Sequence, residues 1–149
     1  MLGVLTPEEI EAVLRSDVIG RIGCRGDDRV YVVPITYAYD GEAVYAHSAE
    51  GLKLAMMRRD PDVCFEVEHM DDLANWRSVI AWGRFEELRG EDAARGMQRL
   101  IDRLRPLMVS ATATPTHGLG EAHRADVHAR HATIYRIKLA EKTGRFERR

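Results

Sequence analysis

The sequence predicts a mainly β protein, a small antiparallel barrel of six strands with short flanking helices. The first observation is a set of six runs rich in β-branched and aromatic residues and separated by turn residues. These runs are Val18–Cys24, Val30–Tyr39, Ala43–His47, Val63–Glu68, Ser78–Leu88 and Thr133–Leu139. The second is a chain length of 149 residues, which suits one domain, residues 1–149, with a single core.

The N-terminal segment predicts a helix that begins after Thr6 and ends near Ser16. Thr6 can cap the helix, Pro7 suits its first turn, and the two acids that follow complement the helix dipole. An apolar stripe of Ile10, Val13 and Leu14 then gives this helix one core-facing side.

Asp40-Gly41 predicts a β-hairpin, because both residue types tolerate positive φ in a tight turn. The pair separates the runs Val30–Tyr39 and Ala43–His47, which we therefore expect to be hairpin partners. Farther on, Val63–Glu68 alternates apolar and acidic residues, as a strand with one buried face and one solvated face does.

Two later stretches carry helical patterns, Leu52–Arg59 and Asp92–Leu104, and helices at these places would cover the barrel openings. The second stretch ends before Pro106, which disfavours helical backbone in the residue that precedes it. Ser110–His131 has no regular pattern, and a loop of this length is usually functional or disordered.

The residues after the Asp40-Gly41 hairpin suit a phosphate group. Ser48 supplies a hydroxyl, Gly51 a flexible backbone, and Lys53 an ammonium group near the start of a predicted helix. The N-terminus of a helix favours anions through its dipole and its unpaired N–H groups. We expect the phosphate end of a cofactor here, although a solvated lysine on a helix face is the ordinary alternative for Lys53.

Pro34 interrupts an otherwise strong strand. Since proline cannot donate a hydrogen bond to a sheet, it indicates an edge strand, a bulge, or a place where a flat ligand lies alongside.

Composition excludes several classes of function. The 22 basic and 24 acidic residues give no large positive field, so we do not expect nucleic acid as a partner. No run of about 18 apolar residues is present, and the N-terminus does not read as a signal peptide, so we expect a cytoplasmic protein without a membrane span. Cys24 and Cys64 lie far apart in apolar runs, which favours two buried hydrophobes over a redox pair.

Five segments together carry a resemblance to a known family. They are Ile19–Gly23, Val33–Tyr37, Val44–Lys53, Asp60–Phe65 and Trp76–Gly83. In these motifs and in the order of its elements, nearly the whole chain resembles the pyridoxamine-5'-phosphate-oxidase-like split-barrel FMN-binding family, in particular its nitroimidazole-resistance branch.

The resemblance implies a homodimer with FMN at its interface. It places the isoalloxazine ring beside one strand, the phosphate or ribityl chain at the end of the second hairpin strand, and further contacts on a later strand. The residues implied, in that order, are Pro34, Ile35 and Thr36; His47, Ser48 and Lys53; and Arg77 and Ser78. For His47, a packed histidine at a strand end is the alternative; for Arg77, it is a surface ion pair.

The implied activity is that of an oxidoreductase passing electrons from a reduced nicotinamide to a small electron-poor acceptor. The alternatives are a haem- or deazaflavin-binding protein of the same fold, or a non-catalytic flavin carrier or sensor. Ser48–Lys53 holds one cation and a glutamate where pyridoxamine oxidases have a serine-arginine-lysine motif, so we do not expect pyridoxal phosphate as a product. We find no nucleophile with an adjacent base, which disfavours a hydrolase.

Histidines and aromatic residues supply further candidates. His117, His123, His128 and His131 match no zinc-site spacing, so we expect a polar loop and no metal there. Trp76, Trp82 and Tyr37 are candidates for a substrate pocket, although for Trp82, in mid-strand, core packing is the favoured interpretation.

Overall fold

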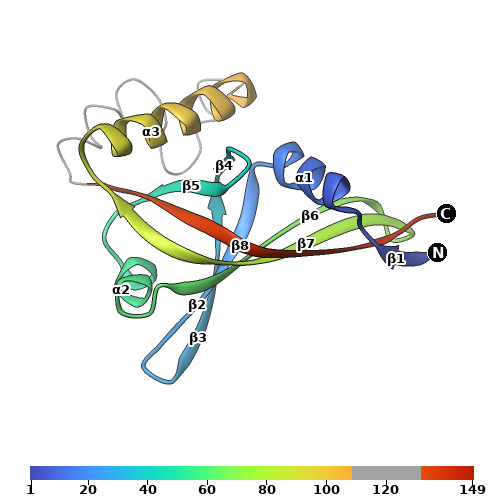
Figure 1. The fold of residues 1–149 in the computed structure, drawn as a ribbon, viewed down its shortest axis with the longest axis horizontal. Coiled ribbons are helices and arrows are strands. Elements are labelled where there is room, and N and C mark those ends of the chain that lie inside the picture. The colour runs from blue at the N-terminus through green and yellow to red at the C-terminus, as the bar shows by residue number, and fades with distance from the viewer. Residues whose placement is uncertain (109–131) are drawn as a thin grey trace.

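The computed structural model describes residues 1–108 and 132–149, and its main feature is one antiparallel sheet of eight strands (Figure 1). The strands are β1 (Leu2–Val4), β2 (Ile19–Gly26), β3 (Arg29–Thr36), β4 (Ala38–Tyr39), β5 (Ala43–Ser48), β6 (Asp62–Asp72), β7 (Asn75–Leu88) and β8 (Thr133–Glu147). Their order in the sheet is β3-β2-β6-β7-β8-β5-β4, and β1 pairs with β8. The two ends of this order, β3 and β4, do not pair, so the sheet forms a split barrel rather than a closed one.

The predicted helices are present. They are α1 (Pro7–Ser16), α2 (Leu52–Arg59) and α3 (Gly90–Leu104), followed by a short 3-10 turn at Arg105–Leu107. At the start of α1 a capping box forms, because the Thr6 hydroxyl accepts from the Glu9 amide and the Glu9 carboxylate accepts from the Thr6 amide. The predicted helix start and the predicted apolar stripe are therefore confirmed.

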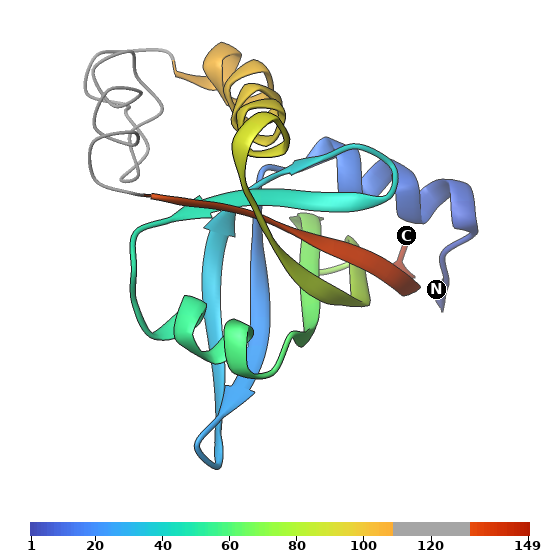
Figure 2. The same ribbon diagram turned by 60° about the vertical axis from the view of Figure 1, so that its left-hand side comes forward.

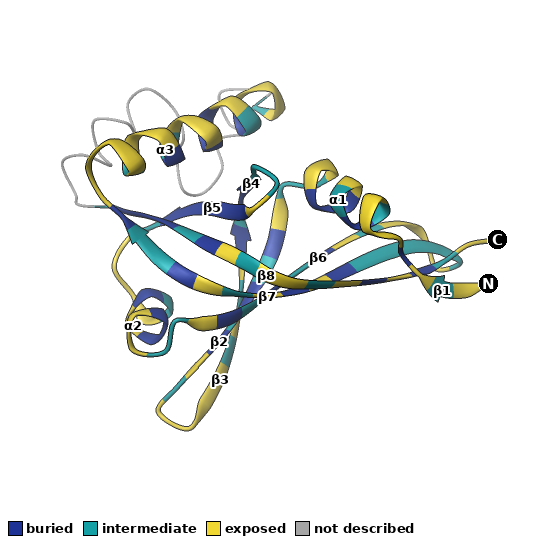
Figure 3. Cartoon of the chain, in the orientation of Figure 1, coloured by how far each residue is buried: buried dark blue, intermediate teal, exposed yellow. Residues whose placement is uncertain are grey.

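The helices divide the core into two clusters (Figure 3). The larger one fills the barrel interior between α1, α2 and the inward side chains of the strands, with Tyr37, Phe65 and Tyr135 fully buried. The smaller one lies where α3 covers the other face of β5 and β8, as Figure 2 shows. Each strand face that meets a core is thus set by the alternation of its residues.

β8 holds the sheet together, since it pairs with three other strands. Thr133–Lys138 pairs with β5, almost the full length of β8 pairs with β7, and Arg145–Glu147 pairs with β1. A register shift beside Gly83 bends the β7–β8 ribbon, and its far half extends away from the barrel toward both termini (Figure 1).

The predicted pairing around Asp40-Gly41 is wrong for most of its length. Only Ala38–Tyr39 pairs with β5 across that turn, whereas β3 pairs with β2 through a tight turn at Asp27-Asp28. Both aspartates have positive φ, 52° and 58°, which Asp tolerates better than most residues. The sequence run Val30–Tyr39 therefore contains two strands that turn toward different partners.

The six-strand prediction is corrected to eight. The extra strands are β1, too short to show a pattern, and β4, split off at Tyr37, where the backbone amide donates to Val18. In addition, β6, β7 and β8 extend beyond the predicted runs, because their outer parts form an exposed ribbon whose side chains are mostly polar. The histidines at 117, 123, 128 and 131 lie outside the described residues.

Candidate functional site

The predicted phosphate site lies where β5 ends and α2 begins. Gly51 is the N-cap of α2 and supplies no side-chain cap, and the first turn of the helix contains no acidic residue. The N–H groups of that turn thus have no side-chain acceptor, the arrangement that an anion completes. The Ser48 hydroxyl lies beside this turn in sequence and donates to the Ala49 carbonyl at 2.8 Å.

Lys53 stands in the first turn of α2 and is half-buried against the barrel. It follows from the spacing of three residues that Lys53 and Met56 share a helix face, and the Met56 sulfur contacts Cys24 inside the barrel at 3.9 Å. Burial lowers the pKa of the Lys53 ammonium, which the Cys24 thiolate would partly offset. Within the described chain, no carboxylate forms an ion pair with Lys53.

The other two cations of α2 are already neutralised. Arg58 binds the Glu50 carboxylate through two nitrogens at 2.7 and 2.8 Å and also contacts Glu87 at 2.9 Å. Arg59 pairs with Asp27 at 3.0 Å. Glu50, the acid inside the predicted phosphate motif, is therefore held by Arg58, which leaves Lys53 as the α2 cation without a counter-charge.

His47 and Ser48 point to opposite faces of the sheet. Since side chains alternate along a strand, Ser48 shares the barrel-side face of β5 with Val44 and Ala46, whereas His47 shares the face that α3 covers with Tyr45. His47 is buried there. The structure thus brings Ser48, but not His47, to the face on which Lys53 lies.

Pro34, Ile35 and Thr36 lie on the edge strand β3, which agrees with the edge interpretation of the proline. β3 pairs with β2 along one side only, so its other side carries backbone groups without a partner strand in the described chain. Pro34 is exposed, Ile35 is buried and Thr36 is half-buried. A flat ring could lie along this edge without displacing a strand.

Arg77 and Ser78 lie far from the α2 site of the same chain. Along β8, Thr133 is the partner of Ser48 and Phe146 is the partner of Arg77. These partners are 13 residues apart, about 43 Å along a straight strand at about 3.3 Å per residue. One chain therefore does not bring Arg77 close to Ser48 and Lys53.

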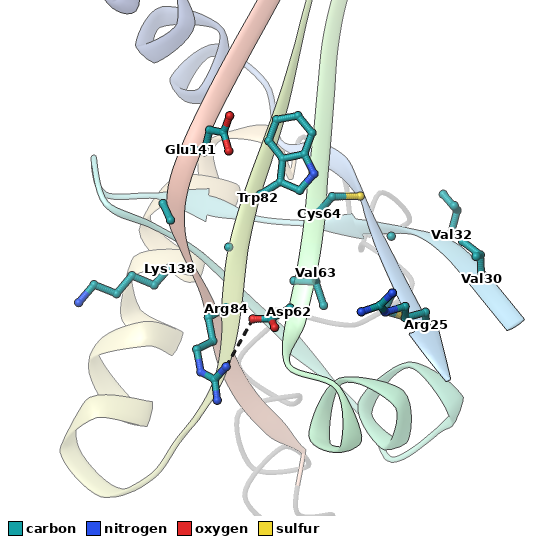
Figure 4. A pocket seen from close by; sticks show the side chains of 14 residues that line it. Arg25, Val30, Val32, Asp62, Val63, Cys64, Trp82, Arg84, Lys138 and Glu141 are labelled. Atoms are coloured by element: carbon teal, nitrogen blue, oxygen red, sulfur yellow. Dashed lines mark hydrogen bonds and ion pairs between the residues drawn. The ribbon is translucent and has the colours of Figure 1, made fainter. Parts of the chain in front are cut away.

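A large pocket lies on the outer face of the sheet, and none of the predicted site residues lines it. Its volume is about 700 Å³, and it crosses β3, β2, β6, β7 and β8 (Figure 4). Trp82 lines this pocket with 44% of its surface exposed, so the favoured core-packing interpretation of Trp82 is wrong. Cys64 also faces the pocket and is only partly buried, whereas Cys24 is buried in the core; both are free thiols.

A cluster of charges adjoins this pocket on the same outer face. Arg21 contacts Glu66 at 3.5 Å and Glu68 at 3.3 Å, so two carboxylates share one guanidinium group. Burial and the neighbouring Glu68 raise the pKa of Glu66 to about 7. In the sheet register, Arg21 lies between Pro34 and Glu66.

Two expectations concern absences. None of the helices within residues 1–108 and 132–149 combines the length and the apolar composition needed to cross a membrane. In the same part of the chain, three or more metal-ligating side chains do not gather at any point.

Comparison with protein families identifies the class. Residues 6–146 match the model of a family described as pyridoxamine 5'-phosphate oxidase, and the chain belongs to this family. An uncharacterized protein from Rhizobium meliloti is 36% identical over 85 residues, which cover 57% of this chain and 56% of that protein. The match thus spans little more than half the length of that relative.

Solved structures share the fold. An FAD-binding protein from Mesorhizobium loti superposes with a TM-score of 0.77 at 28% identity, with 98% of each chain covered. A proposed 5-nitroimidazole antibiotic resistance protein from Bacteroides thetaiotaomicron gives a TM-score of 0.73 at 17% identity, covering 98% of this chain and 87% of that one. The second likeness concerns the fold alone.

Proposed function

We propose that this protein is a homodimeric FMN-binding oxidoreductase that passes electrons from a reduced nicotinamide to a small electron-poor acceptor. The observation that carries the proposal is Lys53, a half-buried cation without a carboxylate partner in the described chain. It lies at a helix N-terminus that also lacks an acid. A phosphate dianion would supply the missing negative charge and accept from the N–H groups of the first turn.

The residues present fit a flavin mononucleotide. Lys53, Ser48 and the first turn of α2 would hold the phosphate, and the free edge of β3 at Pro34–Thr36 would lie beside the ring. His47 faces α3, so in this proposal it positions β5 by packing and does not touch the phosphate. The family and the FAD-binding protein from Mesorhizobium loti support a flavin; FMN is preferred here because the site offers one phosphate-binding cation.

The homodimer follows from the separation between the two halves of the site. If Arg77 and Ser78 contact the flavin that Lys53 holds, they must come from another copy, because β8 keeps them about 43 Å from Ser48 in one chain. The ribbon that carries them extends beyond the barrel, and its tip exposes Met70 and Leu73. A two-fold pair of such ribbons would complete two equivalent sites.

A bound flavin supplies the reactive centre for hydride and electron transfer. The residues of this chain would bind it, orient it and shield it from water. This division of labour agrees with a site in which we find a phosphate cradle and a ring edge, but no nucleophile with an adjacent base.

The first experiment is the absorption spectrum of the purified protein, followed by titration with FMN. A flavin spectrum, with bleaching by a reduced nicotinamide and recovery on addition of an acceptor, is expected. A Soret band would replace FMN with haem, and a flavin that reduced nicotinamide does not bleach would indicate a carrier.

The placement of the phosphate is tested with Lys53→Ala. Loss of a charge-assisted contact is expected to weaken FMN binding roughly 10- to 100-fold. Arg59→Ala is the matched control, since Arg59 lies on the same helix but pairs with Asp27 on the surface. Equal FMN affinities for wild type and Lys53→Ala would show that the phosphate binds elsewhere.

Mixed dimers test the two-chain site. Lys53→Ala and Arg77→Ala should each bind FMN weakly, yet refolding them together should restore binding at about a quarter of the sites, because one site of each mixed dimer is intact. No recovery would mean that both residues serve the same chain or that Arg77 is not part of the site.

A further inference from the structure

A trough crosses the outer face of the sheet, on the side opposite the barrel interior. Four residues on neighbouring strands form its floor: Val32 of β3, Gly23 of β2, Cys64 of β6 and Trp82 of β7. The sheet register places them side by side, with Gly23 opposite both Val32 and Cys64, and Cys64 opposite Trp82. All four line the pocket of about 700 Å³ (Figure 4).

The trough is hollow because two of its floor residues are small. Gly23 has no side chain, and a Cβ built there would lie 2.6 Å from the Cys64 sulfur. Cys64 itself is short, while the rows on either side carry long side chains such as Arg21 and Arg84. The volume falls in the usual range of small-molecule sites, about 300–1,000 Å³.

Trp82 gives the trough an aromatic platform. Its indole is 44% exposed on a strand whose inward residues Val79 and Ala81 are fully buried. At the other end of the trough, Val30 and Val32 are also exposed and apolar. A planar aromatic ring can stack on the indole and cover the glycine and the thiol.

The charges of one rim select the ligand. Three cations, Arg25, Arg84 and Lys138, stand along this rim. Arg25 pairs with Asp60 at 2.8 Å and Arg84 with Asp62 at 3.4 Å.

Lys138 forms no ion pair within the described chain, so the rim carries one uncompensated positive charge. Glu141 lies opposite Trp82 at the ring end of the trough and disfavours a second negative charge on the ligand.

We propose that this trough is a binding site for a planar aromatic monoanion. The ring of the ligand lies on Trp82 above Gly23 and Cys64, and its anionic group is bound by Lys138. This site is separate from the phosphate cradle at α2 and does not depend on the proposed flavin.

The test uses 2-naphthoate as the probe, with the uncharged 2-naphthamide beside it, and isothermal titration calorimetry as the readout. Wild type should bind naphthoate more tightly than naphthamide. Trp82→Leu should weaken both probes roughly tenfold, whereas Trp82→Phe should retain most of the affinity. Lys138→Gln should weaken naphthoate roughly fivefold and abolish the preference for it over naphthamide.

Trp76→Leu is the control, since Trp76 does not line the trough, and its affinity should equal that of wild type. The proposal is overturned if wild type binds neither probe, or if Trp82→Leu binds as wild type does. It is also overturned if wild type sediments as a dimer and Trp82→Leu as a monomer, because the trough would then be part of a subunit interface.

Discussion

Replacing Glu66 with glutamine should make the stability of the protein less dependent on pH. The Glu66 carboxyl lies on the outer face of β6, where its charged neighbours are Arg21 from β2 and Glu68 from the same strand. β7 places the uncharged Ile80 opposite it. One guanidinium group thus serves two carboxylates, and the pKa of Glu66 rises to about 7.

The sign and size of the effect follow from proton linkage. Between the ordinary glutamate pKa of 4.5 and the folded value of about 7, the folded state holds a proton that the unfolded state has lost. The free energy of unfolding therefore decreases as pH rises through this window. At about 1.4 kcal/mol per pKa unit the loss is at most about 3 kcal/mol, and screening reduces it, because 27% of the side chain is exposed.

Urea unfolding at pH 5 and pH 8 measures this difference. Wild type should lose stability between the two values, whereas Glu66→Gln should lose less and should be the more stable protein at pH 8. Glu68→Gln is a useful companion, because removing its charge should lower the pKa of Glu66 and also reduce the pH dependence. If wild type and Glu66→Gln show the same change between pH 5 and pH 8, the proposed proton on Glu66 is absent.

Two further substitutions test the packing. Tyr37→Phe should cost about 1–1.5 kcal/mol in denaturant unfolding, because the buried Tyr37 hydroxyl donates to the Leu14 carbonyl at 2.8 Å and joins β3 to α1; an unchanged midpoint would show that this bond adds nothing. Gly20→Ala should cost about 1–3 kcal/mol in thermal unfolding, since a Cβ there would lie 2.4 Å from the Phe65 ring and 2.9 Å from the Glu66 carbonyl oxygen. Wild-type stability in Gly20→Ala would mean that the ring moves aside freely.

The elements that sequence patterns predicted well are those with strong local signals. α1 has a capping box and an apolar stripe, and α2 was placed at its observed bounds. Strand pairing was harder, because an Asp-Gly pair indicates a turn but not how many residues pair across it. The β2–β3 turn uses Asp27-Asp28, a weaker signal than Asp-Gly, and the exposed half of the long ribbon has little apolar alternation to reveal it.

The candidate site was predictable in part. Lys53 could be placed at a helix start from sequence, but its missing counter-charge could not, because Arg58 and Glu50 find each other only in the fold. The opposite directions of His47 and Ser48 follow from simple alternation, a signal that the sequence contained. The trough could not be found, since it depends on the register that aligns Gly23, Cys64 and Trp82 across three strands.

The central place of β8 has a consequence for synthesis on the ribosome. Its residues 133–147 are the partners of β1, β5 and β7, so those strands emerge from the exit tunnel long before their partner is made. Until residue 147 is available, β5 and β7 present open edges that other nascent chains can pair with. Production of this protein should therefore be sensitive to translation speed and to chaperones that shield such edges.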